Sequence, residues 1–186
     1  MSWIKKGFPL FLSYGLSGNP YFLFLNITNR LVVCEIPGEK VQIDVKVVPY
    51  YCIRGNLRRD EKSLYQWTAI DECTRVRYVH IFEAHTPENS VKFLKMFLSW
   101  FPFEVMCVQT DNGTEFTYKF ISDEVKCQFE SKLEELGIEH RLIKPRTPWH
   151  NGKVERSHRM DQRYFYEWET FSETEEANKK SKEHLE

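Results

Sequence analysis

"EKVQIDVKVVPYY", residues 39–51, is the stretch that decides the fold. Its side chains alternate in character, with Val41, Ile43, Val45 and Val47 on one side and Gln42, Asp44 and Lys46 on the other. An alternation with a period of two is typical of a β-strand with one buried face. A carboxylate in the middle of such a strand is costly unless it is paired or bound to a cation. The pattern therefore predicts either an ion pair of Asp44, with Lys46 or a loop arginine, or a functional role for this acid.

The segments that follow this strand predict an alternation of strands and helices. A charged loop over 54–62 leads to two further strand patterns, over 63–71 and 75–84, which together predict an antiparallel meander. The rest of the chain predicts strands over 103–110 and 138–143, and helices over 85–102, over 120–136 and from about 151. The predicted order is strand-strand-strand-helix-strand-helix-strand-helix.

Each predicted helix has recognisable ends or a recognisable apolar side. The first begins with Thr86 as N-cap and Pro87 in its first turn, and the second ends at Gly137. The second helix is expected to bury Val125, Phe129, Leu133 and Leu136. The third helix is expected to bury Met160, Tyr164, Trp168 and Phe171.

Length and charge limit the class of protein. At 186 residues the chain is long enough for one core-forming domain, which we place at 39–171, with an unassigned segment at 1–38 and an acidic tail at 172–186. Lys and Arg number 26 against 27 Asp and Glu, so the net charge is −1 and the chain is not globally basic. From 140 to 163, however, seven Lys and Arg stand against two acids. A nucleic-acid partner is therefore expected to bind at this segment.

The cysteines and the amino-terminal segment indicate a cytoplasmic protein. The five cysteines are odd in number, widely spaced and without a C-x-x-C pair, which disfavours a disulfide framework and a zinc ribbon and favours reduced thiols. Lys5 and Lys6 precede an apolar stretch as in a signal peptide, but Pro9, Gly15 and Gly18 interrupt that stretch. Since no run of about 18 apolar residues follows, we expect neither secretion nor a membrane span.

Three acids occupy positions where a charge needs an explanation: Asp44, Asp111 and Glu155. Asp44 lies in mid-strand. Asp111 follows an apolar strand and begins an Asn-Gly turn, a position that Asp favours for its backbone hydrogen bonds alone. Glu155 falls in the first turn of a helix, where the helix dipole favours an acid. Each acid has a structural explanation of its own, and one functional explanation covers all three.

A mid-strand acid, a strand-end acid and a first-turn helix acid can converge in a domain of this order. Three neighbouring carboxylates repel one another and attract a divalent cation, and ligands made only of oxygen suit Mg²⁺ or Mn²⁺ better than zinc. Two such ions about 4 Å apart activate an attacking oxygen and stabilise a leaving one in phosphoryl transfer. The histidines lack the paired spacing of a zinc site, and we expect polar surface roles for His140, His150 and His158.

Three blocks of the sequence resemble those of the DDE integrase and transposase catalytic core, which retroviral integrases and bacterial insertion-sequence transposases share. The blocks are "QIDVK" (42–46), "VQTDNGTEF" (108–116) and "RTPWHNGKVERSHR" (146–159). The resemblance covers about residues 39–171. It implies an α/β protein with the ribonuclease H-like fold, in which a mixed five-stranded sheet is flanked by helices. It also implies a catalytic and metal-binding triad of Asp44, Asp111 and Glu155 with two Mg²⁺ or Mn²⁺ ions.

The resemblance further implies a function on DNA. The core would cut DNA strands at the ends of a mobile element and transfer the freed 3′-hydroxyl to target DNA, as a homo-oligomer without membrane contact. Phosphates and bases of DNA would meet the segment around the third block, at Arg146, Trp149, Asn151, Lys153, Arg156 and Arg159. A solvated helix face is the structural alternative for these charges.

Two departures from the family pattern leave other functions open. The spacing between Asp111 and Glu155 is longer than in the retroviral branch, which points to a bacterial transposase-like branch. No helix-turn-helix pattern precedes the core. One alternative is therefore a metal-dependent nuclease without strand joining, and another is a catalytically silent, truncated transposase remnant that binds DNA or oligomerises. Joined products distinguish transferase from nuclease, and metal dependence distinguishes either enzyme from the silent remnant.

Overall fold

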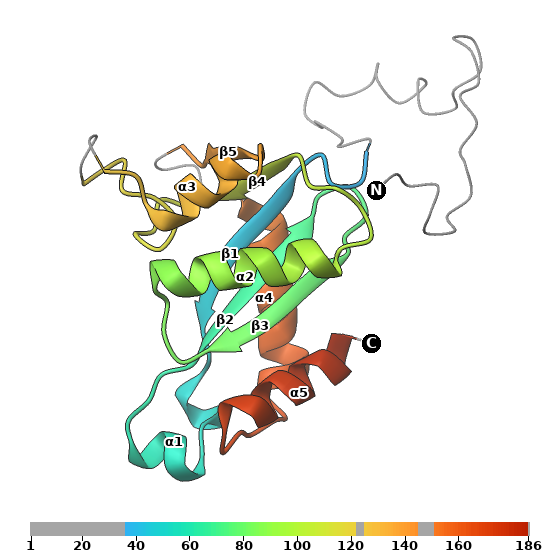
Figure 1. The fold of residues 1–186 in the computed structure, drawn as a ribbon. Coiled ribbons are helices and arrows are strands. Elements are labelled where there is room, and N and C mark those ends of the chain that lie inside the picture. The colour runs from blue at the N-terminus through green and yellow to red at the C-terminus, as the bar shows by residue number, and fades with distance from the viewer. Residues whose placement is uncertain (1–35, 122–124, 145–150, 186) are drawn as a thin grey trace, which may run out of the picture. The chain divides into compact units, whose positions relative to one another are not determined.

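The computed structural model describes residues 36–121, 125–144 and 151–185, and a five-stranded sheet forms its centre (Figure 1). Along the sheet the order is β3-β2-β1-β4-β5, with β1 (Val41–Val47), β2 (Tyr65–Asp71), β3 (Arg77–Phe82), β4 (Cys107–Thr110) and β5 (Glu139–Leu142). The β1–β2 and β2–β3 pairs are antiparallel, and the β1–β4 and β4–β5 pairs are parallel. The predicted meander and the mixed five-stranded sheet are confirmed.

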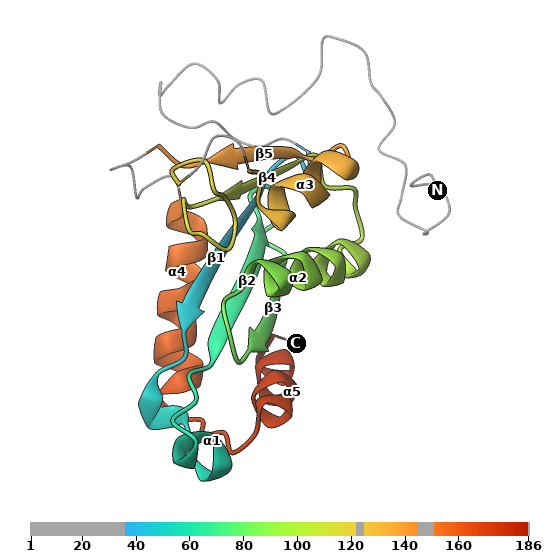
Figure 2. The ribbon, with the colours of Figure 1, turned by 60° about the vertical axis from the view of Figure 1, so that its left-hand side comes forward.

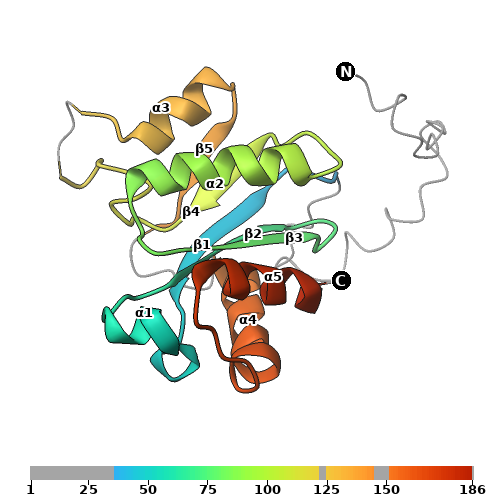
Figure 3. The ribbon, with the colours of Figure 1, turned by 60° about the horizontal axis from the view of Figure 1, so that its bottom comes forward.

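Helices cover both faces of the sheet (Figures 2 and 3). One face lies under α2 and α3, and the other lies under α4 and α5. The helical elements are η3 (Tyr50–Cys52), α1 (Gly55–Arg59), α2 (Pro87–Trp100), α3 (Gln128–Glu135), α4 (Gly152–Asp161), η5 (Gln162–Tyr166) and α5 (Thr174–Leu185). Because η5 is a π-helical turn that continues α4 directly, the two form one rod across the sheet.

Aromatic and branched side chains fill the space between the sheet and α2. Val41 and Ile43 of β1 and Trp67 of β2 are fully buried there. Trp67 packs against Phe93 of α2 and Phe116, with ring centroids 5.7 and 5.5 Å away. Val41, Ile43 and Val45 of the predicted apolar half therefore face this core, whereas Val47 at the end of the strand is 58% exposed.

The polar half of β1 faces α4 instead of solvent. The backbone N–H of Val154 at the start of α4 donates to Gln42 Oε1 at 3.2 Å. One turn further along the helix, Lys46 Nζ donates to the carbonyl oxygen of His158 at 3.2 Å. Since Gln42, Asp44 and Lys46 share one side of the strand, Asp44 lies between these two contacts, under the helix.

The buried side of α4 and η5 differs from the predicted one. Met160, Tyr164 and Trp168 are exposed, Trp168 to 79%, and only Phe171 of the four predicted residues is buried. The helix instead buries Val154, Ser157, His158, Asp161, Phe165 and Tyr166. Because the sheet face beneath it is polar, the helix turns polar side chains inward, and a search for apolar spacing selects the wrong side.

The other helix boundaries were predicted with mixed success. Thr86 caps α2 as expected, since its Oγ1 accepts from the N–H of Asn89 at 3.3 Å. Gly137 follows α3 with a positive φ of 68°, as its predicted role as a stop requires. The predicted start of α3 at 120 is wrong, because the helix begins at Gln128 and Val125 is 58% exposed. The segment 54–62, expected to be a loop, contains the short helix α1.

Helix α5 makes the acidic tail a packed element of the fold. Its Ala177 is fully buried, and Asn178 bonds both backbone groups of Ile81 in the edge strand β3. The amide oxygen accepts from the Ile81 N–H at 2.8 Å, and the amide nitrogen donates to the Ile81 carbonyl at 2.9 Å. Within the described ranges, every helix is too short or too polar to cross a membrane.

Candidate active site

Asp44 lies in the middle of β1, opposite Thr68 of β2, and its side chain is 20% exposed. Among the described residues it forms no ion pair with Lys46, because the Lys46 ammonium group bonds to Gln162 Oε1 at 2.7 Å. The ion-pair explanation with Lys46 is therefore wrong.

The electrostatic surroundings of Asp44 are negative. Burial, as the largest cause, and the charges of Asp111, Glu155 and Glu115 together raise the pKa of its carboxyl group to about 7. One hydrogen bond from backbone, at Val45, acts in the opposite direction. The structure thus brings Asp111 and Glu155 into electrostatic range of Asp44.

Asp111 reaches this place through strand register. Val41 pairs with Val108 and Gln42 with Gln109 in the parallel β1–β4 ladder, and the continuation of this register sets Asp111 beside Asp44. Asp111 also begins the turn that its structural explanation predicts, since its Oδ1 accepts from the Gly113 N–H at 3.0 Å. Turn formation and a place beside Asp44 are therefore compatible.

Glu155 lies in the first turn of α4, and its side chain is exposed. In the part of the chain that the structure describes, no group of three or more His, Cys, Asp or Glu side chains is arranged to hold a metal ion. Asp111 and Glu155 are near enough to influence the pKa of Asp44, and the described side chains do not close a three-ligand site.

The chemistry of the donors nevertheless fits a hard divalent cation. Asp44, Asp111 and Glu155 offer only carboxylate oxygens, the ligands that Mg²⁺ and Mn²⁺ prefer. Burial and, after it, repulsion from neighbouring carboxylates raise the pKa of Asp44, and a bound cation would favour its charged form. The residues present therefore suit such an ion.

A fourth acid, Glu115, was missed by the sequence reasoning. Burial raises the pKa of its carboxyl group, and the neighbouring charge of Asp111 raises it as well. The carboxylate folds back over Gly113, where an added Cβ atom would lie 2.6 Å from Oε2. The only signal for it in the sequence is its place in the block "VQTDNGTEF", four residues after Asp111.

Lys153 at the start of α4 is held by an acid that the sequence reasoning also missed. Its Nζ lies 3.0 Å from Glu72 Oε2, and the same carboxylate contacts Lys40 Nζ at 2.9 Å through its other oxygen. Although burial opposes it, hydrogen bonds from Lys40, Gln42 and Lys153 lower the pKa of Glu72 to about 2. Part of the positive charge of Lys153 is therefore already neutralised.

The remaining predicted DNA contacts differ in exposure. Arg156 and Arg159 are exposed, and no acid of the described ranges forms an ion pair with either. Asn151 is 2% exposed, and its Oδ1 accepts from Gln109 Nε2 at 3.4 Å, so its DNA contact stays a prediction. Arg146 and Trp149 lie outside the described residues.

His158 is part of a buried polar network, which corrects its expected surface role. It is 8% exposed, and burial lowers its pKa to about 4. Its Nε2 lies 3.1 Å from Thr68 Oγ1, and its Nδ1 lies 3.5 Å from Asp44 Oδ2. Further along, Gln66 and Asp161 continue the network beneath α4. His150 lies outside the described residues.

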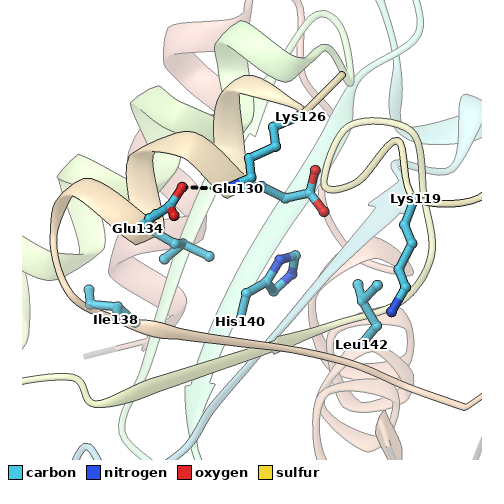
Figure 4. A pocket seen from close by; sticks show the side chains of 8 residues that line it. Lys119, Lys126, Glu130, Glu134, Ile138, His140 and Leu142 are labelled. Carbon is cyan, nitrogen blue, oxygen red and sulfur yellow. Dashed lines mark hydrogen bonds and ion pairs between the residues drawn. The ribbon is translucent and has the colours of Figure 1, made fainter. Parts of the chain in front are cut away.

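A separate pocket of about 500 Å³ opens between α3 and β5 (Figure 4). It is lined by Lys119, Lys126, Glu130, Leu133, Glu134, Ile138, His140 and Leu142. His140 is hydrogen-bonded to Thr110 Oγ1 at 2.9 Å, and burial lowers its pKa to about 4. Lys126 and Glu134 of this lining form an ion pair at 2.6 Å. None of the acids of the triad lines this pocket.

Comparison of the sequence with known families identifies an integrase family. The sequence model described as "Integrase core domain" matches residues 35–148. The match includes Asp44 and Asp111, and Glu155 lies just beyond it. A curated relative, described as "Putative integrase ORF3" of Spiroplasma virus SpV1-C74, is 28% identical over 106 residues. That alignment covers 53% of this chain and 29% of the viral protein.

Solved structures share the fold. A chain of the simian T-cell lymphotropic virus intasome, solved in complex with PP2A regulatory subunit B56 gamma, superposes with a TM-score of 0.56 at 18% identity. This superposition covers 72% of this chain and 41% of the viral one. The dimeric form of the HTLV-2 integrase catalytic core domain superposes with a TM-score of 0.50 at 17% identity, over 69% of this chain and 70% of that one. The chain thus spans less than half of the viral proteins named first.

Proposed function

The chain belongs to the integrase core domain family, and from this premise we propose that it is the catalytic core of a DNA integrase or transposase. Its reaction is a Mg²⁺- or Mn²⁺-dependent polynucleotidyl transfer, in which a DNA strand is cut and the freed 3′-hydroxyl is joined to target DNA. The observation that carries this proposal is the concentration of negative charge around Asp44, contributed by acids from three separate elements.

In this proposal Asp44, Asp111 and Glu155 hold the metal ions. When bound, the ions activate the attacking oxygen and stabilise the leaving oxygen of the phosphodiester. The acids are supplied by a strand, a strand end and a helix start, so that rigid elements position them. The exposed side chain of Glu155 faces solvent, where the DNA substrate approaches.

Positive charge beside these acids would bind the DNA backbone. Arg156 and Arg159 are exposed on α4, one and four residues after Glu155. Guanidinium groups bind phosphate oxygens in a bidentate manner. Lys153 has a different task in this proposal, since its bond to Glu72 fixes the start of α4 relative to β2. Binding through phosphates implies weak dependence on DNA sequence and a steep dependence on salt.

Related structures support the remaining parts of the proposal. The HTLV-2 integrase core was solved in complex with magnesium and in a dimeric form. The simian viral chain was solved within an intasome. We propose by analogy that this chain also uses a divalent metal and acts as a homo-oligomer on DNA.

The test is the substitution Glu155→Gln, assayed on a pre-branched DNA that resembles the strand-transfer product. The variant keeps the size and helix position of the side chain but removes one anionic ligand. Cleavage and joining in Mg²⁺ or Mn²⁺ should therefore fall by about two or more orders of magnitude, while DNA binding stays equal or strengthens slightly. Glu175→Gln is the matched control, because it makes the same charge change in the first turn of α5.

Each outcome selects one function. An active wild-type chain with an equally active Glu155→Gln variant contradicts the role of Glu155. Cleavage without any joined product indicates the metal-dependent nuclease. A wild-type chain that binds DNA but is inert in both metals indicates the catalytically silent remnant, which the lack of a closed three-ligand site among the described residues favours.

A further inference from the structure

We propose that His158 is a positioning residue for Asp44, and that a chain of buried hydrogen bonds through Thr68 and Gln66 sets the orientation of its ring. This inference rests on the proposed function, since Asp44 is the carboxylate that would hold the metal. His158 lies on the inward side of α4, and its two ring nitrogens face two different partners. Nδ1 lies 3.5 Å from Asp44 Oδ2, and Nε2 lies 3.1 Å from Thr68 Oγ1.

Hydrogen bonds in the sheet decide which ring nitrogen carries the proton. The Gln66 amide nitrogen donates to Asp161 Oδ2 at 2.7 Å and to Thr68 Oγ1 at 2.9 Å, since a carboxylate can only accept. We assign the proton of the Thr68 hydroxyl to its bond with His158 Nε2, because the carboxylate of Asp44 near the other ring nitrogen can only accept. A neutral ring that accepts at Nε2 carries its proton on Nδ1. The ring therefore presents an N–H to Asp44.

The far end of this chain of hydrogen bonds is fixed by charge. Arg77 binds Asp161 through two nitrogens, at 2.6 and 3.0 Å, and Tyr166 donates its hydroxyl to Gln66 Oε1. Because both ends of the Gln66 amide group are engaged, the amide has one orientation. The direction of each later bond, through Thr68 to His158, follows from it.

An N–H at Oδ2 orients the Asp44 carboxylate and leaves Oδ1 as the oxygen available to a metal ion. The distance of 3.5 Å is long for a hydrogen bond, and such contacts commonly tighten when the substrate complex assembles. Groups that orient a metal ligand in this way change metal affinity or activity about 10- to 100-fold when they are removed. We expect the removal of His158 to change metal affinity by a factor in this range. The effect would act through Asp44, without contact between His158 and DNA.

Two substitutions of His158 separate its two contacts. His158→Asn places an amide nitrogen near the position of Nδ1 and keeps a donor for Asp44. His158→Gln reaches Thr68 but presents no donor to Asp44. The measurement is Mn²⁺ binding by the full chain at fixed pH, followed by the electron paramagnetic resonance signal of free Mn²⁺, with melting temperatures of all variants. We expect His158→Gln to weaken Mn²⁺ binding about tenfold and His158→Asn to recover most of it.

The outcomes also separate this inference from the proposed function. The inference is overturned if both variants bind Mn²⁺ with the same affinity. This holds if that affinity equals the wild-type value, and also if it falls together with the melting temperature, because the ring would then be structural only. Wild-type binding that Asp44→Asn abolishes and His158→Gln leaves intact overturns the inference alone. A wild-type chain that binds no Mn²⁺ overturns the inference and the proposed metal site together.

Thr68 provides a second test if a variant at 158 fails to fold. Thr68→Val keeps the shape of the side chain but removes the hydroxyl, so the ring proton is free to occupy either nitrogen. Mn²⁺ affinity should fall, by less than in His158→Gln, and Thr68→Ser should restore it. A Thr68→Val variant that is folded and binds Mn²⁺ as the wild type does contradicts the assigned direction of the bonds.

Discussion

The two faces of the central sheet hold their helices by different interactions. Beneath α2, Trp67 and Phe93 pack within an apolar core, whose contacts have no preferred direction. Beneath α4, Gln66, Thr68 and His158 are joined by hydrogen bonds, each of which needs both of its partners. Apolar cores tolerate exchange between side chains of similar volume, and buried polar networks do not. The face with the acids is thus the one that tolerates the least change.

The largest expected effect tests the polar face directly. Asp161→Ala leaves the half-buried guanidinium of Arg77 without its carboxylate and removes an acceptor from Gln66. The loss in the free energy of unfolding should be about 3–5 kcal/mol, measured by urea denaturation. Leu94→Met in the apolar core is the control, and it should cost less than about 1.5 kcal/mol. Equal costs of the two substitutions would remove the distinction between the faces.

The second prediction concerns pH. The pKa of Asp44 is about 7 in the folded chain against an ordinary value of 3.8, so the folded state holds this proton more tightly than the unfolded state does. The contribution of Asp44 to stability is therefore fully present below about pH 4 and is lost as pH rises to 7. In metal-free buffer at pH 8, Asp44→Asn should stabilise the chain by about 1–3 kcal/mol, and the gain should vanish below pH 4.

Melting temperatures of wild type and Asp44→Asn across this pH range, with a chelator present, measure that gain. Addition of Mg²⁺ at pH 8 should raise the wild-type melting temperature more than that of the variant. If Asp44→Asn instead destabilises the chain at pH 8, the negative charge of Asp44 does not destabilise the folded state.

The smallest expected effect compares inward and outward charges on α4. Replacing Arg156 and Arg159 together by Gln should reduce the slope of log affinity against log salt by about 2. Lys153→Gln should reduce it by less than about 1, because Glu72 already binds this ammonium group at 3.0 Å. Fluorescence anisotropy of a labelled duplex at several salt concentrations measures both slopes. A larger reduction of the salt slope by Lys153→Gln would mean that the Lys153 ammonium group binds a DNA phosphate.

Sequence patterns predicted the apolar half of this molecule better than the polar half. The alternation in β1 identified the side that faces the core, and Thr86 identified the start of α2. The buried side of α4 was predicted wrongly, because apolar spacing locates a buried face only where the opposing surface is apolar. Exposed Trp168 and buried Asp161 both reverse the usual preference. Asp161 is held by Gln66 of β2 and Arg77 of β3, residues that no local pattern links to the helix.

The candidate site divides in the same way. Asp44, Asp111 and Glu155 could be proposed from three short sequence blocks, and the charges of Asp111 and Glu155 contribute, after burial, to the raised pKa of Asp44. The contact of His158 with Asp44 and the bond of Lys153 to Glu72 could not, since each joins residues far apart in the chain. Such contacts follow from strand register and helix placement, which local spacing does not contain.

The amide of Asn178 imitates a neighbouring strand at the edge of the sheet. It satisfies both backbone groups of Ile81, the groups through which a foreign strand would pair with β3. Aggregation by strand addition is therefore blocked at this point unless α5 first detaches. The other edge, β5, is four residues long and carries Glu139 and Arg141, which also discourages pairing. Copies of this chain that assemble should consequently contact one another through helices and loops, and not by pairing between the edge strands of their sheets.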